Sequence, residues 1–179
     1  MAGHTSQAVD RRRLVELKAR YEDSGKARAL LAGSEHIGTY GQTDTYFALG
    51  ERRLKLREIA DRAAAQLVYY ERPDDAGVKE SEVLLYEVVD PVVLKEMLGR
   101  TIGVRVVVRK QREIYRHEGV QVHVDDVERL GHFVEFELAV EDAPDAVVEG
   151  RARLAAMKTF FGIPDEDLVA SSYSDLLAD

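Results

Sequence analysis

The sequence predicts an α+β protein whose main feature is an antiparallel sheet of about eight strands that curls or closes, with helices packed against its outer side. Two observations lead to this prediction. Runs of alternating apolar and polar residues recur along the chain, and many are joined by short polar turns of hairpin length. Helical periodicity is confined to three segments, which is too little for a repeating βαβ array.

The strand signals follow one another in chain order. Each is a run rich in β-branched, aromatic or leucine residues with apolar side chains at alternate positions, bounded by turn residues. We expect strands at residues 13–20, 43–49, 52–59, 64–72, 81–89, 103–116, 120–127 and 132–140. The short connections favour hairpins, and therefore antiparallel pairing.

Three segments have apolar residues at helical spacing. Residues 24–32 follow a capping residue, and residues 90–98 begin with Asp90 as the cap and Pro91 at the first helical position. Residues 143–161 form the longest segment and offer apolar positions that would cover one side of a sheet. The length predicts one domain over residues 1–179, with residues 1–11 as a flexible N-terminus.

Composition narrows the function classes. The chain has no cysteine, which excludes disulfides, thiolate metal sites and cysteine nucleophiles, so a metal would be held by oxygen or imidazole. The formal net charge of −8 disfavours a broad footprint on DNA or anionic lipid. No run is apolar enough for a spanning helix and no signal peptide is recognised, so we expect a cytoplasmic protein.

Charged residues occupy one face of many predicted strands. In "RRLKLRE" Lys55 and Arg57 alternate with leucines, and in "VQVHVDD" His123 and Asp125 alternate with valines. Cations gather at positions 18–20, 55–57, 72 and 110–112, and carboxylates at 16, 125, 135 and 137. The simplest interpretation is that these faces lie in solvent. The alternative is a sheet closed with the charges inward, where a polyanion and divalent metal ions would be their partners.

Seven motifs follow one another along the chain, namely "VELKAR", "QTDTYF", "LKLRE", "YYERPD", "VVRKQREIY", "HVDDVERLGHFVEFE" and the tail "GIPDEDLVASSYSDLL". Their order resembles the CYTH superfamily, the group of class IV adenylyl cyclases and thiamine triphosphatases whose fold is called a triphosphate tunnel. The resemblance implies a closed antiparallel β-barrel of about eight strands with helices outside. It also implies a metal-dependent enzyme that acts on a triphosphate in the barrel lumen, by cyclisation of ATP to cyclic AMP and pyrophosphate or by triphosphate hydrolysis.

The resemblance further implies roles for individual residues. The substrate-binding residues would be Lys18, Arg20, Lys55, Arg57, Arg72, Lys110, Arg112 and His123. Ligands of Mg²⁺ or Mn²⁺ would be Glu16, Glu135 and Glu137, with Asp125 as a ligand or a supporting group. Catalytic roles would fall on Glu16, Lys18, Arg57 and Asp125. The partner would be a small molecule, namely a nucleoside triphosphate, thiamine triphosphate or tripolyphosphate, and neither DNA nor a membrane.

One position departs from the family pattern. The first glutamate of the ExExK signature falls at Leu14, and the neighbouring Arg12 and Arg13 are of the wrong type to replace it. This departure supports an alternative, a non-catalytic protein that binds triphosphates or polyphosphate. A biosynthetic enzyme that uses another phosphorylated organic substrate is a third hypothesis. Tyr173, Ser174 and Asp175 in the tail would close the tunnel or contact a base, or else dock as a C-terminal cap. A homodimer is expected from the general frequency of such assemblies.

Overall fold

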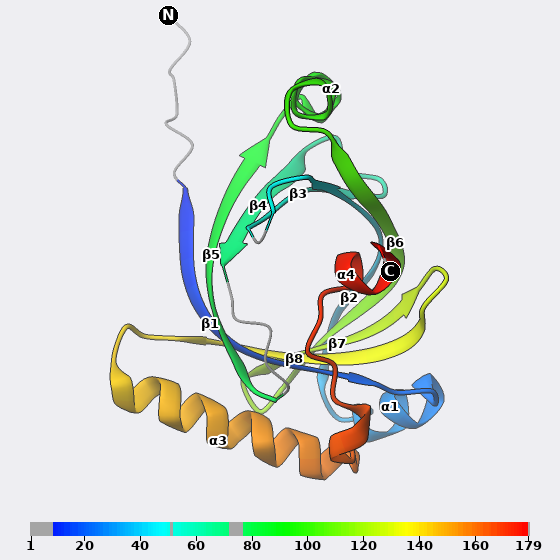
Figure 1. Cartoon of the computed structure of the whole chain (residues 1–179). Helices are drawn as coiled ribbons and strands as arrows, with labels where there is room; N and C mark the ends of the chain where they lie inside the picture. The colour runs from blue at the N-terminus through cyan, green and yellow to red at the C-terminus, as the bar shows by residue number, and fades with distance from the viewer. Residues whose placement is uncertain (1–8, 51, 72–76, 179) are drawn as a thin grey trace, which may run out of the picture.

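The computed structural model describes residues 9–50, 52–71 and 77–178, and the strands in these ranges form a closed antiparallel barrel (Figure 1). They are β1 (Asp10–Arg20), β2 (Glu35–Phe47), β3 (Arg53–Ile59), β4 (Ala65–Glu71), β5 (Lys79–Val88), β6 (Val104–His117), β7 (Val120–Val127) and β8 (Gly131–Val140). Around the barrel their order is β1-β5-β4-β3-β2-β6-β7-β8, and β8 closes the barrel by pairing with β1. The predicted fold class is therefore confirmed.

The helices lie where the sequence predicts three of them, with one addition at the C-terminus. They are α1 (Ser24–Leu30), α2 (Pro91–Thr101), α3 (Pro144–Phe161) and α4 (Tyr173–Ala178), with a short 3₁₀ turn at Asp165–Asp167. The Asp23 carboxylate caps α1 by accepting from the Lys26 backbone N–H at 2.8 Å, and α3 ends at Gly162, whose φ of 66° suits a residue without a Cβ. No helix in the described ranges is both long and apolar enough to cross a bilayer.

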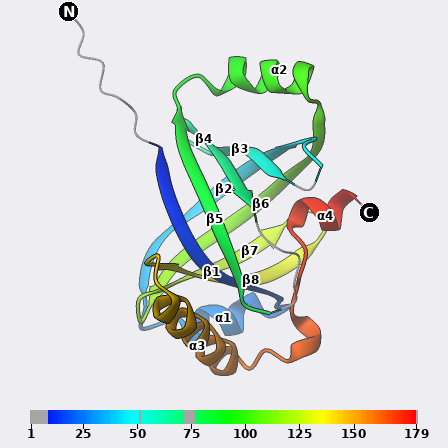
Figure 2. The same ribbon diagram turned by 60° about the vertical axis from the view of Figure 1, so that its left-hand side comes forward.

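The outer face of the barrel is apolar where α3 covers it. Val15, Leu17 and Ala19 alternate with the charged residues of β1 and point outward, where they join the valines of β7 in one buried cluster. Leu154 and Phe161 of α3 complete this cluster from outside. α2 lies on the opposite side of the barrel from α3 (Figure 2) and packs Leu94, Leu98 and Ile102 against a separate cluster on the outside of the strands there. These two clusters thus cover the outside of the barrel, whereas a third cluster, which includes Tyr46, Val68 and Tyr70, shares the interior with the polar groups.

Two strands begin three or more residues earlier than the sequence predicts. β2 begins at Glu35 rather than at residue 43, because its first half pairs with β6 along a stretch that contains two glycines and has little apolar alternation. β1 begins at Asp10, which pairs with Leu85 of β5. The expectation of a flexible N-terminus is therefore wrong for Asp10 and Arg11, and its part at residues 1–8 lies outside the described residues.

The close contact between α3 and the barrel predicts an unusual response to a helix-favouring substitution. A Cβ atom at Gly150 would lie 2.8 Å from Cγ2 of Val15 and 2.9 Å from Cγ1 of Val140, so Gly150→Ala should destabilise the protein by about 1–3 kcal/mol. At Gly99 of α2 the nearest atom would be Val104 Cγ2 at 3.6 Å, so Gly99→Ala should stabilise it by up to about 1 kcal/mol. Urea unfolding measures both changes, and two changes of the same sign would contradict this packing.

Candidate functional site

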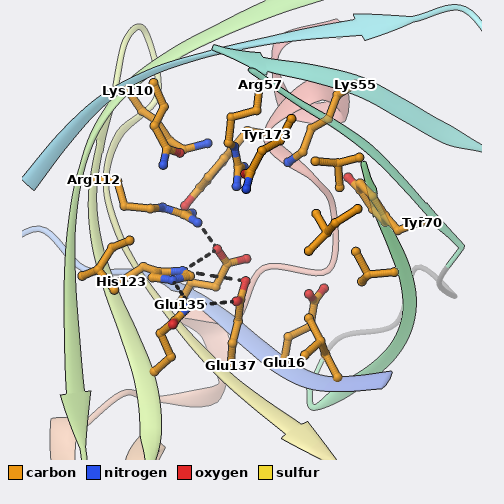
Figure 3. A pocket seen from close by; sticks show the side chains of 18 of the residues that line it. Glu16, Lys55, Arg57, Tyr70, Lys110, Arg112, His123, Glu135, Glu137 and Tyr173 are labelled. Atoms are coloured by element: carbon orange, nitrogen blue, oxygen red, sulfur yellow. Dashed lines mark hydrogen bonds and ion pairs between the residues drawn. The ribbon is translucent and has the colours of Figure 1, made fainter. Parts of the chain in front are cut away.

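The barrel encloses a cavity of about 360 Å³, a volume in the range of small-molecule sites. Its charged lining includes Glu16, Lys18, Lys55, Arg57, Lys110, Arg112, Glu135 and Glu137, together with His123. These side chains come from alternate positions of β1, β3, β6, β7 and β8 and converge on one space (Figure 3). The interpretation that the charged faces of the strands lie in solvent on the outside of a sheet is therefore wrong for these residues.

Asp44 of β2 binds three of the cations. Its carboxylate accepts two hydrogen bonds from Arg57, both at 2.8 Å, in the bidentate geometry that favours this pair. Lys110 donates to the same carboxylate at 2.9 Å, and Lys55 lies 3.1 Å from it. Asp44 is fully buried, and β2 lies between the strands that carry these cations, so one carboxylate partly compensates three positive charges.

The charged side chains of this cluster shift one another's pKa values. Burial alone would raise the pKa of Asp44, but the positive charges of Arg57, Lys110 and Lys55 outweigh burial and hold the pKa well below its usual value. For Lys110, burial lowers the pKa, and the Asp44 charge only partly opposes it because Arg57, Arg112 and Lys55 act in the same direction as burial. The pKa of Lys110 is about 7, so this ammonium group loses its proton far more readily than an ordinary lysine.

Arg112 is held by two carboxylates. It donates to Asp125 at 2.7 and 2.6 Å and to Glu135 at 2.7 Å, and Lys18 lies 3.3 Å from the other oxygen of Glu135. The Tyr173 hydroxyl donates to Asp125 at 2.8 Å. Burial, and then the Asp125 and Glu135 charges, raise the pKa of Tyr173 well above its usual value, so the phenol stays protonated and keeps this bond.

His123, Glu135 and Glu137 form a group that could hold a metal ion. Their potential ligand atoms all lie within 4.8 Å of one another, and His123 Nδ1 lies 3.4 Å from Glu135 and 3.7 Å from Glu137. The other ring nitrogen of His123 lies 2.9 Å from the Gln121 side chain, which positions the ring. Glu16 faces Glu137 across the β1–β8 pair, and Figure 3 shows its side chain on the far side of Glu137 from His123. Oxygen and imidazole donors suit Mn²⁺, and the carboxylates suit Mg²⁺.

The C-terminal tail lies against β1 and contributes Ser172 and Tyr173 to the cavity lining. The Val169 backbone N–H donates to the Lys18 carbonyl at 2.9 Å, which brings the tail along β1 and sets Tyr173 in the cavity lining. Asp175 then pairs with Arg53 at 2.9 Å, at the first residue of β3. Burial opposes ionisation of Asp175, but hydrogen bonds from Ser172 and Arg53 lower its pKa to about 2. The tail is therefore docked against β1 and β3, and its other suggested roles, closing the tunnel or contacting a base, stay predictions.

Two of the described residues assigned from the resemblance do not line the cavity. Arg20 is exposed at the end of β1, where it donates to the Leu130 carbonyl at 3.3 Å. Asp125 is fully buried behind Arg112, with both oxygens engaged, so its position suits a supporting group rather than a metal ligand. Arg72 lies outside the described residues.

The sequence reasoning missed Asp44 as a site residue. The signal was present in "QTDTYF", where Gln42, Asp44 and Tyr46 alternate along β2, and Gln42 and Tyr46 line the cavity. Asp44 is the carboxylate that this inward face places between the cations of β3 and β6, which flank β2.

Comparisons with known proteins agree with this architecture. The family model described as the CYTH domain matches residues 12–173. A Methanocaldococcus jannaschii protein named "Putative adenylate cyclase" is 28% identical over 173 residues, which cover 90% of this chain and 97% of that protein. A solved structure from Pyrococcus horikoshii is 27% identical with a TM-score of 0.81, and the match covers 91% of this chain and 98% of the other. A second solved structure, described as a "Putative adenylyl cyclase" from Hippeastrum with a dominant triphosphatase activity, is 20% identical with a TM-score of 0.62, and the match covers 92% of this chain and 93% of the other.

The role of Asp44 predicts that the free protein depends on it for stability. Asp44→Asn would leave Arg57, Lys55 and Lys110 without their shared negative charge, so we expect a loss of about 3–5 kcal/mol in the free energy of unfolding. Asp126→Asn on β7 is the control, because its carboxylate is 63% exposed, and should change stability by less than about 0.5 kcal/mol. Urea unfolding of the two variants checks this, and equal small effects would show that Asp44 does not compensate the cations.

Proposed function

The chain belongs to the CYTH domain family, and on this premise we propose that it is a metal-dependent enzyme that acts on a triphosphate bound in the barrel lumen. One observation carries the proposal. Five cations, Lys18, Lys55, Arg57, Lys110 and Arg112, line the same cavity as the group formed by His123, Glu135 and Glu137. A triphosphate chain with a divalent ion matches both sets of charges at once.

The cations would bind the phosphate chain in place of their present carboxylate partners. Arg57 offers a planar pair of N–H donors, which suits two oxygens of one phosphate. Lys55 and Lys110 bring point charges from the strands on either side of β2. Arg20 is left out of this binding set, since its side chain lies outside the cavity.

A divalent ion fits the donor set of His123, Glu135 and Glu137, with Glu16 close by across the β1–β8 pair. When bound, Mg²⁺ or Mn²⁺ would neutralise charge on phosphate oxygens. Arg112 and Lys18 keep Glu135 in the form that binds cations: burial alone would raise its pKa, but their charges hold the pKa well below its usual value. Asp125 supports the set by fixing the Arg112 guanidinium at 2.7 and 2.6 Å.

The chemistry that this arrangement suits is displacement at phosphorus. Attack by a ribose 3′-hydroxyl on the α-phosphorus breaks the bond to pyrophosphate and gives a cyclic nucleotide, whereas attack by water on the terminal phosphorus releases orthophosphate. Both reactions require the protein to position the substrate and to supply positive charge, more than to supply a nucleophile. The names of the Methanocaldococcus and Hippeastrum proteins cover both reactions and support an enzyme of one of these types.

Leu14 favours a second candidate, a non-catalytic triphosphate binder. It lines the cavity two residues before Glu16, where the family signature has a glutamate, so the metal site has one carboxylate fewer. If the missing carboxylate limits turnover, Leu14→Glu should gain metal-dependent activity. A wild-type protein that already turns over at about 1 s⁻¹ or faster, without improvement in the variant, would exclude this candidate.

The experiment that tests the proposal follows the phosphorus NMR spectrum of ATP, GTP, thiamine triphosphate and tripolyphosphate with the protein and Mg²⁺ or Mn²⁺. Orthophosphate release identifies hydrolysis, and pyrophosphate with a cyclic nucleotide identifies cyclisation.

Arg57→Ala should weaken tripolyphosphate binding by about 100-fold, because charge-assisted hydrogen bonds are lost. Arg116→Ala is the matched control on β6, since its exposed guanidinium pairs with Glu35 outside the cavity. Equal affinities for both variants in calorimetry would contradict the proposed phosphate site.

The pKa of Lys110 predicts how affinity depends on pH. Above about pH 7 the free protein holds Lys110 increasingly without its proton, whereas phosphate favours the ammonium form, so binding takes up a proton. This step should reduce the affinity by up to about ten-fold per pH unit from pH 7 to pH 9. Lys110→Arg keeps its charge over this range and should remove the step, while the ligand's own ionisation affects both proteins alike. Calorimetric titrations at several pH values compare the two, and parallel pH profiles would contradict the prediction.

A further inference from the structure

The group formed by His123, Glu135 and Glu137 combines one imidazole with two carboxylates. His123 faces Glu135 in the β7–β8 register, and Glu137 follows two residues later on the same inward face of β8. Figure 3 shows the ring and both carboxylates on one side of the cavity. A cation bound between them would therefore meet a nitrogen donor as well as oxygen donors.

The spacing of these donors fits an ion better than a hydrogen bond. Nδ1 of His123 lies 3.4 Å from Oε2 of Glu135 and 3.7 Å from Oε1 of Glu137. Both distances exceed the roughly 2.7–3.2 Å of an ordinary N–H···O hydrogen bond. Two donor atoms on a tetrahedral ion with bonds of about 2.0–2.1 Å lie about 3.3–3.4 Å apart, so small shifts of the side chains would let one ion contact all three residues.

The oxygen donors of this group are few and partly engaged. One oxygen of Glu135 lies 2.7 Å from Arg112, and the other lies 3.3 Å from Lys18. Leu14 lines the cavity at the position where the family signature has a glutamate. Mg²⁺ is bound in proteins through carboxylate oxygens and water, whereas imidazole favours transition metals. The balance of donors is therefore less favourable for Mg²⁺ than for a transition-metal ion.

Gln121 is placed to control which nitrogen of His123 carries the proton. Its amide nitrogen lies 2.9 Å from Nε2 and can only donate, so in this arrangement the ring proton is on Nδ1. A half-turn of the amide would bring its oxygen to Nε2, which then becomes the donor and leaves the electron pair of Nδ1 for an ion. The ring is 2% exposed, so the barrel wall holds it in place.

We propose that this group selects a divalent first-row transition-metal ion over Mg²⁺, and that His123 is the residue that determines the selectivity. Its role rests on the proposed function, because the ion that His123 selects is the one that would neutralise the phosphate oxygens. A site of carboxylates alone would bind both classes of ion through the same oxygens and discriminate less. Gln121 acts as a positioning residue, since its effect on the ion is carried by the ring.

Isothermal titration calorimetry of the chelator-treated full-length protein with Ni²⁺ and with Mg²⁺ measures the selectivity. His123→Asn should weaken Ni²⁺ binding by about 100-fold and change Mg²⁺ affinity by less than about three-fold, so that the ratio of the two affinities falls. Gln121→Ala should weaken Ni²⁺ binding by about ten-fold. His132→Asn is the matched control, since this histidine of β8 is absent from the cavity lining and lies beside Asp126, and it should change neither affinity.

The electron spin echo spectrum of bound Mn²⁺ tests the nitrogen contact directly. Because an imidazole ligand couples its nitrogen nucleus to the unpaired electrons of the ion, we expect nitrogen modulation in the wild type and in His132→Asn, and its loss in His123→Asn. A His123 ring that contacts only the protein would give no such modulation in the wild type. The wild-type spectrum therefore decides even if His123→Asn fails to fold.

Tripolyphosphate titrated into the same chelator-treated samples separates this inference from the proposed function. If tripolyphosphate binds but His123→Asn weakens both ions equally or neither, or the Mn²⁺ spectrum shows no nitrogen, the selectivity is overturned and the triphosphate site stands. If the ions bind as expected but tripolyphosphate does not, the proposed function is overturned and the selectivity is confirmed. If neither tripolyphosphate nor any of the ions binds the wild type, both are overturned.

Discussion

The structure depends on one electrostatic constraint, that charged side chains inside a closed barrel must have partners. Removing an ion from water into a protein interior costs several kcal/mol unless its charge and hydrogen bonds are satisfied. Asp44 satisfies Arg57 and Lys110, and Arg112 is satisfied between Asp125 and Glu135. The cations are therefore held in place before any ligand arrives, which reduces the cost of ordering them on binding.

The same constraint determines where the apolar residues lie. Because alternate residues of each strand point to opposite sides, charges that face the lumen put apolar side chains on the outside, where water would meet them. Val15 and Leu17 on β1 are buried only because α3 covers them with residues such as Leu154. The tail has a related role, since it brings the Tyr173 hydroxyl to Asp125 and contributes this ring to the cavity lining.

Strand periodicity made much of this predictable from the sequence. The inward positions of Lys55, Arg57 and His123 follow from alternation alone once the sheet closes. Asp44 was missed because its role depends on β2 lying between β3 and β6, and this order of strands is long-range information that no local pattern contains. For the same reason alternation could not show that Arg112 covers Asp125.

The alternation of charged and apolar residues also continues to strand ends, where side chains no longer face the lumen. Arg20 follows the inward pattern of β1, but the strand ends there and the side chain lies in solvent. The first half of β2 was not predicted because its sequence is polar and glycine-rich, and pairing with β6 stabilises it instead.

A crystal structure of the protein with tripolyphosphate tests the central claim, that the paired cations of the lumen exchange their carboxylate partners for phosphate, most directly. The account predicts phosphate oxygens within about 3 Å of Arg57, Lys110 and Arg112, with the Asp44 contacts to Arg57 lengthened. A phosphate chain bound only on the outer surface, or a lumen whose ion pairs are unchanged at saturating ligand, would contradict it.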